Sequence, residues 1–342
     1  MTRRFALAAG LALTLGVLIA APRPAAREDL PSRLTDLELW RLTADSSETD
    51  GYFRSDNLTS NELLYQRVIP DLIARSKPGG VYLGVGPEQN FTYMAALRPA
   101  MAIIFDIRRG NMLVQLMYKA IFELAKDRAD FVALLFSRPR PPGLSAASTV
   151  AEIFSAFAAV EGDEALYKRN REAIEARLTK THGFPLSPKD LVGLDYAYHA
   201  FFLRGYSVRY SPTYAELMTA TDSQGVQRSY LASEASFGFL KALESRNLVV
   251  PIIGDFGGPK AIRAVAAYLK AHQTTVTAFY LSNVEQYLYQ DGKWNAFCRN
   301  FSTLPLERYS TFIRSMSGRG TGLGVGFVSS LGSMVSEAKE CR

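Results

Sequence analysis

Cysteine and histidine are scarce in this 342-residue chain, which contains two cysteines and three histidines. Cys298 and Cys341 are too few for a zinc cluster or a framework of several disulfides. In an oxidising compartment they could form one bridge, and in a reducing one they would remain free thiols. The histidines form no HExxH motif. We therefore expect no metal site built from cysteine or histidine, so that any metal chemistry would have to rest on carboxylates.

The chain also lacks the GxSxG motif of α/β-hydrolases and a strong excess of either charge. The formal net charge is +6, and three of these charges belong to Arg3, Arg4 and Arg23 near the N-terminus. A nucleic-acid-binding domain typically has a clustered basic face, so we expect no nucleic-acid partner. With 48% hydrophobic residues, the chain can fill the core of one large α/β domain or two modest ones.

The first 26 residues have the pattern of an export signal. Arg3 and Arg4 precede an uncharged run from Phe5 to Ala21, and positive charge ahead of such a run predicts that the body of the protein crosses the membrane. We expect a signal peptide or N-terminal membrane anchor over residues 1–26 and a linker over 27–35. The body would then be periplasmic or anchored to the inner membrane through this segment alone. A buried N-terminal helix of a cytoplasmic protein is the alternative.

Two stretches have the pattern of strand, helix and strand. In the first, strands over Val81–Val85 and Met101–Phe105 flank a helix from about Gln89 to Leu97. In the second, LVVPIIGDFGG precedes a helix in PKAIRAVAAYLKAH and a strand in TVTAFYLSN. Strands joined by helices pair in parallel. We therefore predict an α/β fold, a Rossmann-like domain with a mostly parallel sheet over residues 36–315.

Three further segments complete this organisation. Residues from about 140 to 240 have mainly helical patterns and indicate a helical insertion in the Rossmann-like domain. Apolar residues at helical spacing predict a helix from Asn61 to Ala74, with Ser60 or Thr59 as its N-cap. Residues 316–342 are rich in glycine, and we interpret them as a C-terminal tail, because no strand is evident on either side of the glycines.

The turn after the first predicted strand is the strongest candidate for ligand contact. Gly84 and Gly86 allow a ligand to approach the backbone, and the next helix presents its positive N-terminus there. Asp106 ends the second strand, 22 residues after Gly84, a spacing typical of a carboxylate that binds ribose hydroxyls. Gln89 replaces the third glycine of a dinucleotide motif and Pro87 removes an amide, so a nucleoside-like ligand without phosphates fits better than a dinucleotide.

Four segments carry a resemblance to known proteins: SDNLTSNE, YLGVGPEQNFTY, FDIRRGN and YLSNVEQYL. They resemble a family of uncharacterised bacterial proteins, over most of residues 40–315. That family is usually placed near the class I S-adenosylmethionine-dependent methyltransferases, which the GVG turn, helix and acid-ended strand also resemble over about thirty residues. The chain departs from the methyltransferase pattern at Tyr82, where an acid is usual, and at Glu88, where a third glycine is usual.

The resemblance implies S-adenosylmethionine as the cofactor. It also implies which part of the cofactor each of several residues would contact. Gly84 and Gly86 would border its methionine part, and Asp106 would bind its ribose. Glu88 could meet its ammonium group. Asp255 would lie near the methyl acceptor together with Phe256, and could act as the catalytic residue that takes a proton.

The predicted site therefore has a cofactor side and a substrate side. The cofactor side comprises Gly84, Gly86, Glu88, Gln89, Asn90, Asp106, Ile107, Arg108 and Asn111. The substrate side comprises Asn61, Glu62, Phe256, Ser282, Asn283 and Glu285, with Asp255 as the candidate catalytic residue. Each polar residue also has a structural interpretation, because helix starts and strand ends commonly carry capping side chains.

The sequence supports functions of different classes. The first is a methyltransferase-like protein that binds S-adenosylmethionine and acts on an unknown acceptor. The second is an exported Rossmann-like binding or scaffold protein of the cell envelope without methyltransferase activity, because adenosyl cofactors are made and held in the cytosol. A third is a hydrolase with a metal bound by Glu62, Asp106 and Asp255.

Overall fold

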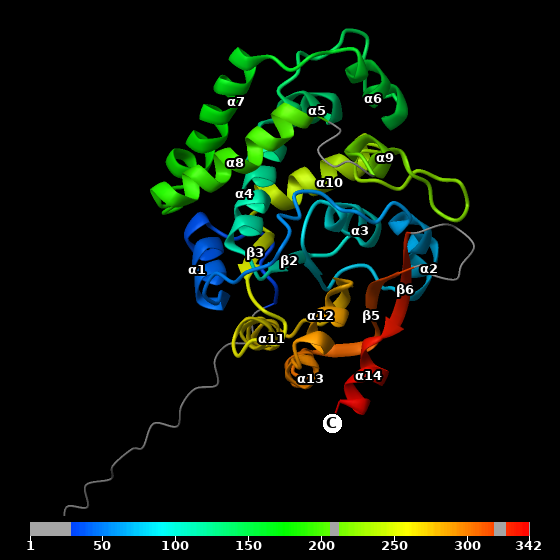
Figure 1. The fold of residues 1–342 in the computed structure, drawn as a ribbon. Coiled ribbons are helices and arrows are strands. Elements are labelled where there is room, and N and C mark those ends of the chain that lie inside the picture. The colour runs from blue at the N-terminus through cyan, green and yellow to red at the C-terminus, as the bar shows by residue number, and fades with distance from the viewer. Residues whose placement is uncertain (1–28, 206–211, 318–325, 342) are drawn as a thin grey trace, which may run out of the picture.

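The computed structural model describes residues 29–205, 212–317 and 326–341. A six-stranded sheet with the order β3-β2-β1-β4-β5-β6 forms its centre (Figure 1). The strands are β1 (Val81–Val85), β2 (Met101–Asp106), β3 (Val249–Ile253), β4 (Val276–Ser282), β5 (Leu306–Ser317) and β6 (Phe327–Ser333). All neighbouring strands pair in parallel except β5 and β6, which are antiparallel. The predicted α/β fold with a mostly parallel sheet is thus confirmed.

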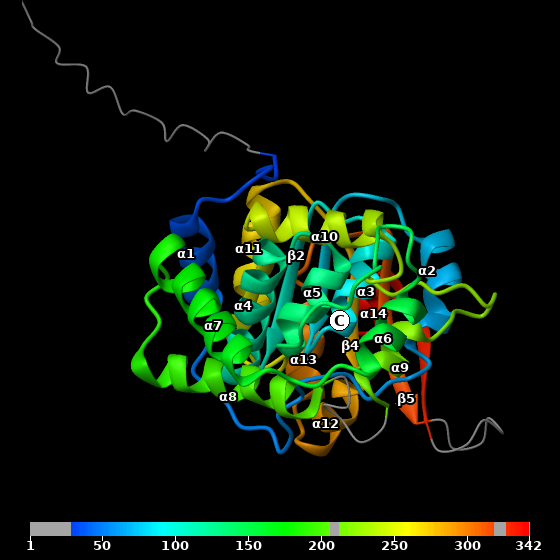
Figure 2. The same ribbon diagram turned by 90° about the horizontal axis from the view of Figure 1, so that it is seen from above.

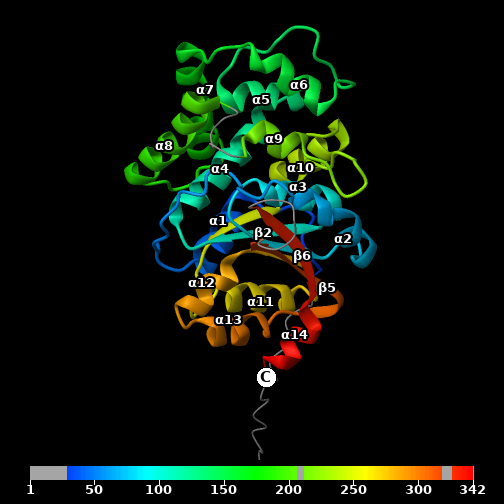
Figure 3. The same cartoon turned by 45° about the vertical axis from the view of Figure 1, so that its right-hand side comes forward.

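Helices cover both faces of this sheet (Figure 3). One face carries α3 (Gln89–Leu97), α4 (Arg109–Leu124) and α10 (Glu234–Ser245), and the other carries α11 (Ala261–Ala271) and α13 (Trp294–Phe301). The remaining elements around the sheet are α1 (Asp36–Ser46), a 3-10 turn η1 (Tyr65–Val68), α2 (Ile69–Arg75), α12 (Val284–Gln290) and α14 (Met334–Glu340). The strand order reverses direction between β1 and β4, and ligands of parallel sheets bind at the carboxyl ends of the strands beside such a reversal.

The first βαβ unit forms at the predicted residues because its strands are covered on both faces. All six residues of β2 and the first four of β1 are buried, which explains why both read as continuous apolar runs. Helix α3 is buried on almost every side, since α2, α10 and β1 all contact it. Gly86 has a φ of +78° and turns the chain from β1 toward α3.

A layer of helices lies over the face that carries α4 and α10 (Figure 2). It comprises α5 (Arg128–Phe136), α6 (Val150–Ala158), α7 (Glu164–Ala176) with a π-helical turn η2 (Arg177–Thr181), α8 (Pro188–Arg204) and α9 (Tyr214–Thr219). This layer occupies the part of the chain where we predicted a helical insertion. It begins earlier than predicted, because α5 already packs against α8.

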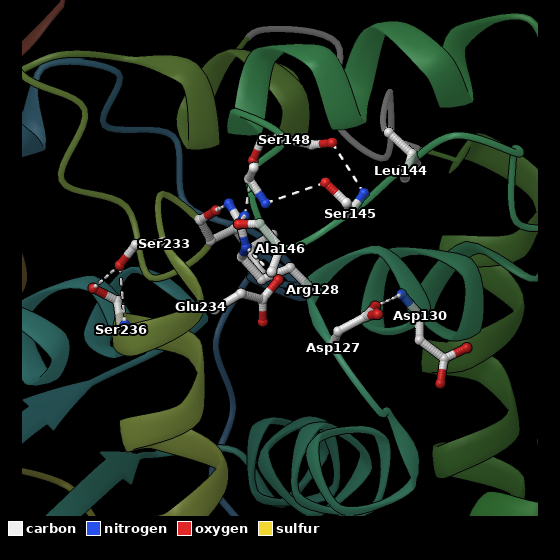
Figure 4. Close-up of polar contacts among 12 residues, drawn as sticks. Asp127, Arg128, Asp130, Leu144, Ser145, Ala146, Ser148, Ser233, Glu234 and Ser236 are labelled. Atoms are coloured by element: carbon white, nitrogen blue, oxygen red, sulfur yellow. Dashed lines mark hydrogen bonds and ion pairs between the residues drawn. The ribbon is translucent and has the colours of Figure 1, made fainter.

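A buried arginine attaches this helical layer to α10. Arg128 is 1% exposed, and its Nε donates to the carboxylate of Glu234 at the start of α10 over 2.8 Å (Figure 4). Nη1 donates to the carbonyl oxygen of Leu231, and Nη2 donates to those of Ala146 and Ser148. All three guanidinium nitrogens thus have acceptors, as a buried cation requires. Arg128 therefore fixes the 144–148 loop and the start of α10 in place.

The helix predicted from Asn61 to Ala74 is shorter than expected. Helical structure begins only at η1, and neither Ser60 nor Thr59 caps it. The Ser60 amide donates instead to the carboxylate of Glu88 over 3.1 Å, and the Ser60 hydroxyl donates to the carboxamide oxygen of Gln89. Because the carboxylate of Glu88 is buried and needs donors, this tertiary contact takes precedence over a local helix start.

The C-terminal residues extend the sheet and are not a mere tail. β6 pairs with β5 over seven residue pairs, and α14 follows it. Cys341 forms a disulfide with Cys298 of α13. Of the two states that the sequence allowed, a bridge or two free thiols, the structure has the bridge. The signal or anchor predicted over residues 1–26 and the glycines at 318, 320, 322 and 324 lie outside the described residues. Within the described residues, no helix is both long and apolar enough to cross a membrane.

Candidate functional site

A cleft of about 320 Å³ opens at the carboxyl ends of β1, β2 and β4. It also reaches the loop after β3 and the start of α12. Residues 52–62, which we call the strap, form another wall of this cleft. The cleft therefore lies at the reversal of strand order between β1 and β4, where the sheet topology places a ligand site.

Most of the predicted site residues meet in this cleft. Its lining includes Asn61, Glu62, Gly86, Asp106, Ile107, Asp255, Phe256, Ser282 and Asn283. They come from the strap, the turn after β1, the ends of β2 and β4 and the loop after β3. Parallel strands bring these distant segments together because their carboxyl ends share one edge of the sheet.

The other predicted residues lie outside the cleft lining, and each has a structural partner or position. They are Gly84, Glu88, Gln89, Asn90, Arg108, Asn111 and Glu285. Glu285 pairs with Arg314, with 2.6 Å between Oε2 and Nε. Arg108 donates to the Ser55 carbonyl oxygen and pairs with Asp56, so it holds the strap. Asn111 is buried in α4, and its Nδ2 has no hydrogen-bond partner among the residues that the structure describes.

Glu88, Gln89 and Asn90 are fully buried at the start of α3. Glu88 accepts from the Ser60 amide, and Gln89 donates to the carboxylate of Glu62 over 2.9 Å. Asn90 donates to the carbonyl oxygen of Val85 over 3.0 Å. These three side chains therefore support the cleft from behind, because each one binds a segment that lines it.

Asp106 combines burial with a position in the cleft wall. It is 6% exposed, and its Oδ1 accepts from the Arg108 amide over 2.9 Å. Burial raises the pKa of the Asp106 carboxyl to about 6, against the opposing effect of the backbone amides of Arg108 and Ile107. Donors supplied by a ligand would stabilise its charged form.

Glu62 is the second buried carboxylate in the cleft wall. Its Oε1 accepts from the hydroxyls of Ser282 over 2.6 Å and Tyr280 over 2.8 Å. Burial raises the pKa of Glu62, against the opposing effect of these hydrogen bonds and that from Gln89. The carboxylate therefore lies in a fixed orientation at the end of β4.

Asp255, the candidate catalytic residue, has an ionic partner. Its Oδ2 lies 2.5 Å from Nζ of Lys293, and its Oδ1 accepts from the Gly257 amide over 2.9 Å. Both of its oxygens are thus in use, although the residue lines the cleft. Lys293 was not predicted as a site residue, because it precedes α13 in a polar turn with no distinctive motif.

The aromatic residues of the strap also line the cleft and were not predicted as site residues. Phe53 packs edge-on against Tyr287 of α12, with 5.1 Å between ring centroids, and Arg54 donates to the hydroxyl of Tyr287 over 3.1 Å. These contacts join the strap to α12 across the cleft. The available signal was a pair of aromatic residues, Tyr52 and Phe53, within the otherwise polar stretch from Asp45 to Asn57.

Within the described ranges, no group of three or more histidine, cysteine, aspartate or glutamate side chains is arranged to hold a metal ion. The three carboxylates considered for a metal enter the cleft from the strap, β2 and the loop after β3. Each has protein partners of its own: Glu62 binds Ser282, Asp106 binds the Arg108 amide and Asp255 binds Lys293.

The fold and the cleft define an α/β protein with a mostly parallel sheet, a helical layer on one face and a ligand-sized cleft at its strand reversal. The sequence model of one family, described as a domain of unknown function (DUF7790), matches residues 58–335. The chain belongs to this family. No curated protein matches the sequence.

Proposed function

We propose that the cleft binds a nucleoside-like ligand, with S-adenosylmethionine as the first candidate, and that the protein is methyltransferase-like. Asp106 carries this proposal. It is a buried carboxylate at the end of β2, it lines the cleft, and it lies beside the turn at Gly86. A ribose offers two hydroxyl donors to such a carboxylate, and Gly86 has no Cβ to keep a ligand from the backbone.

The charges of the cleft favour a cationic, hydroxyl-bearing ligand over a phosphate. Four carboxylates line it, those of Glu62, Asp106, Asp255 and Asp291, against the basic groups of Arg54 and Lys293. S-adenosylmethionine carries a sulfonium and an ammonium group, and both positive charges would be attracted by the carboxylates that line the cleft. Pyrophosphate would be repelled by the carboxylates. Glu88 is buried and does not line the cleft. The ammonium group of the ligand would therefore bind to the carboxylates that do line the cleft.

The two halves of the cleft suit a cofactor and an acceptor. Asp106 ends β2 and Ser282 ends β4, and β1 lies between these strands. When bound, S-adenosylmethionine supplies an electrophilic methyl group. The task of the protein's own residues is then mainly alignment, with a carboxylate at the β3 or β4 end available to take a proton.

Calorimetry on the purified protein tests this proposal with S-adenosylmethionine, adenosine and NAD⁺. We expect the first two to bind and NAD⁺ to bind far more weakly. Asp106→Asn should weaken S-adenosylmethionine binding about tenfold or more, because a hydrogen bond to a charged group contributes roughly 1.5–3 kcal/mol. Asp71→Asn, on the exposed side of α2, is the matched control. Absence of heat with millimolar S-adenosylmethionine would overturn the proposal.

The disulfide favours a second candidate, an exported binding protein without methyltransferase activity. A bond between Cys298 and Cys341 persists in oxidising compartments and is rare in the cytosol. Cell fractionation with thiol trapping tests it: we expect the protein outside the cytoplasm with both cysteines blocked. A cytoplasmic protein with two free thiols would contradict this candidate and leave the first intact.

A further inference from the structure

Ser282 has an unusual backbone conformation at the end of β4. Its φ is +51°, and α12 begins two residues later. A residue other than glycine is strained in the left-handed region, and such strain is often found at functional sites. A strand followed by a strained serine and a helix is also how hydrolases expose a nucleophile at the edge of a sheet. Ser282 has this geometry without the glycines of the GxSxG motif.

A carboxylate lies within hydrogen-bonding reach of this serine. Oγ of Ser282 donates to Oε1 of Glu62 over 2.6 Å. Tyr280 donates to the same oxygen, and Nε2 of Gln89 donates to Oε2. Gln89 is in turn fixed by Tyr93, whose hydroxyl is 3.1 Å from Nε2. A nucleophile, an adjacent base and groups that orient the base are the parts from which covalent catalysis is built.

We propose that Ser282 is a nucleophile and Glu62 its general base, and that the pair gives the cleft an acyl-transfer activity toward small esters or thioesters. Oγ of Ser282 forms a bond to the carbonyl carbon, and its proton passes to Glu62. The bond to the leaving oxygen or sulfur then breaks, and that atom takes the proton from Glu62. Water, deprotonated by Glu62, attacks the acyl-serine and releases the carboxylic acid, with the proton returning to Oγ.

The surroundings of the pair suit this chemistry. Glu62 is 2% exposed, and burial raises its pKa, which makes its carboxylate a stronger base than that of a glutamate in water. Ser282 and Glu62 both line the cleft, so a substrate can reach them. The adjacent side chains of Asn61 and Asn283 also line it and carry amide donors of the kind that stabilise an oxyanion.

This activity is separate from the proposed binding of S-adenosylmethionine. Ser282 and Glu62 lie at the end of β4, whereas the proposed ribose contact, Asp106, lies at the end of β2. Neither the serine nor its base needs the cofactor in the steps above. The two proposals can therefore fail independently of each other.

A biotinylated fluorophosphonate and p-nitrophenyl acetate test the proposal on the purified full-length protein. We expect one phosphonyl adduct, which tryptic mass spectrometry assigns to Ser282. The labelling rate should rise with pH as Glu62 loses its proton, through a value above 4.5, and Glu62→Gln should lower it about 100-fold or more. Ser145→Ala, which removes an exposed serine outside the cleft, should label at the wild-type rate.

Two substitutions separate a chemical role from a structural one. Ser282→Gly should fold, because glycine accepts a positive φ without strain, and should not be labelled. Ser282→Cys should react with iodoacetamide faster than free cysteine and lose that advantage when combined with Glu62→Gln. Absence of labelling in the wild type, or equal labelling of folded Ser282→Gly, would overturn the proposal.

Discussion

The carboxamide oxygen of Asn90 occupies the space in front of the α-carbon of Gly84, where a Cβ would otherwise lie. Asn90 is held there by the hydroxyl of Tyr82, which donates to Oδ1 over 2.9 Å, and by its own bonds to the carbonyl oxygens of Val85 and Pro87. The space beside Gly84 is therefore filled by a side chain of the protein itself, and of the two glycines only Gly86 is in the cleft lining.

Replacing each of these two glycines with alanine should lower the free energy of unfolding by a different amount. Gly84→Ala should lower the free energy of unfolding by about 3 kcal/mol, because its Cβ would clash with Asn90 and Tyr82. Gly86→Ala should cost only about 1–2 kcal/mol, because its φ of +78° is strained for alanine but, apart from its chain neighbours, no described residue has an atom within 4 Å of the new Cβ. Urea unfolding measures both. An Asn90→Ala change should recover part of the loss in Gly84→Ala and none in Gly86→Ala.

The pKa of Asp106 predicts a stability that falls as pH rises. The folded protein binds this proton up to about pH 6, whereas an unfolded chain releases it near 3.8. Between these values the unfolded state holds fewer protons, so stability declines by roughly 3 kcal/mol at most. Asp106→Asn removes the buried charge and should raise the unfolding free energy at pH 7.5 but not below pH 4. Thermal unfolding at both pH values measures this, and a destabilised variant at pH 7.5 would contradict the prediction.

His182 should stabilise the fold at acidic pH. Nδ1 lies 2.7 Å from Oδ1 of Asp36, and Nε2 lies 2.7 Å from Oε2 of Glu123, which also binds Lys119. Burial disfavours the charged ring, but the two carboxylates outweigh burial and raise the pKa of His182. A raised histidine pKa contributes stability that is complete below 6.5 and is lost as pH rises through the folded value.

His182→Gln tests this contribution. The difference in melting temperature from the wild type should be large at pH 5.5 and small at pH 9. His272→Gln is a suitable control, because His272 lies at the end of α11 and contacts neither carboxylate. A difference that does not depend on pH would show that His182 contributes by packing alone.

The disulfide should be a major source of stability at the C-terminus. It joins residues 43 positions apart and encloses β5, β6 and α14. A loop of this size corresponds to about 4 kcal/mol in the chain-entropy model. Reducing agent should therefore lower the melting temperature of the wild type. The double variant Cys298→Ser and Cys341→Ser should melt at the lower temperature with or without reductant, and a wild type insensitive to reductant would contradict the prediction.

The sequence predicted the elements of the sheet more reliably than it predicted contacts. Strands β1 and β2 and helix α3 were predictable because long apolar runs and a glycine turn are local features. The predicted start of the helix that contains α2 was wrong, because Ser60 does not cap a helix. Its amide donates to the buried carboxylate of Glu88, 28 positions away. The edge strand β6 was missed because its residues are only partly buried and carry no apolar run.

Many of the residues that line the cleft were also predictable, because the carboxyl ends of parallel strands lie at one edge of the sheet. The sequence alone therefore determined that Asp106, Asp255 and Ser282 would share this edge. Only the tertiary structure decided which polar side chains face the cleft and which face one another. A buried polar group must find a partner, and that partner can lie far away in the chain. Glu62 and Ser282, 220 positions apart, form such a pair.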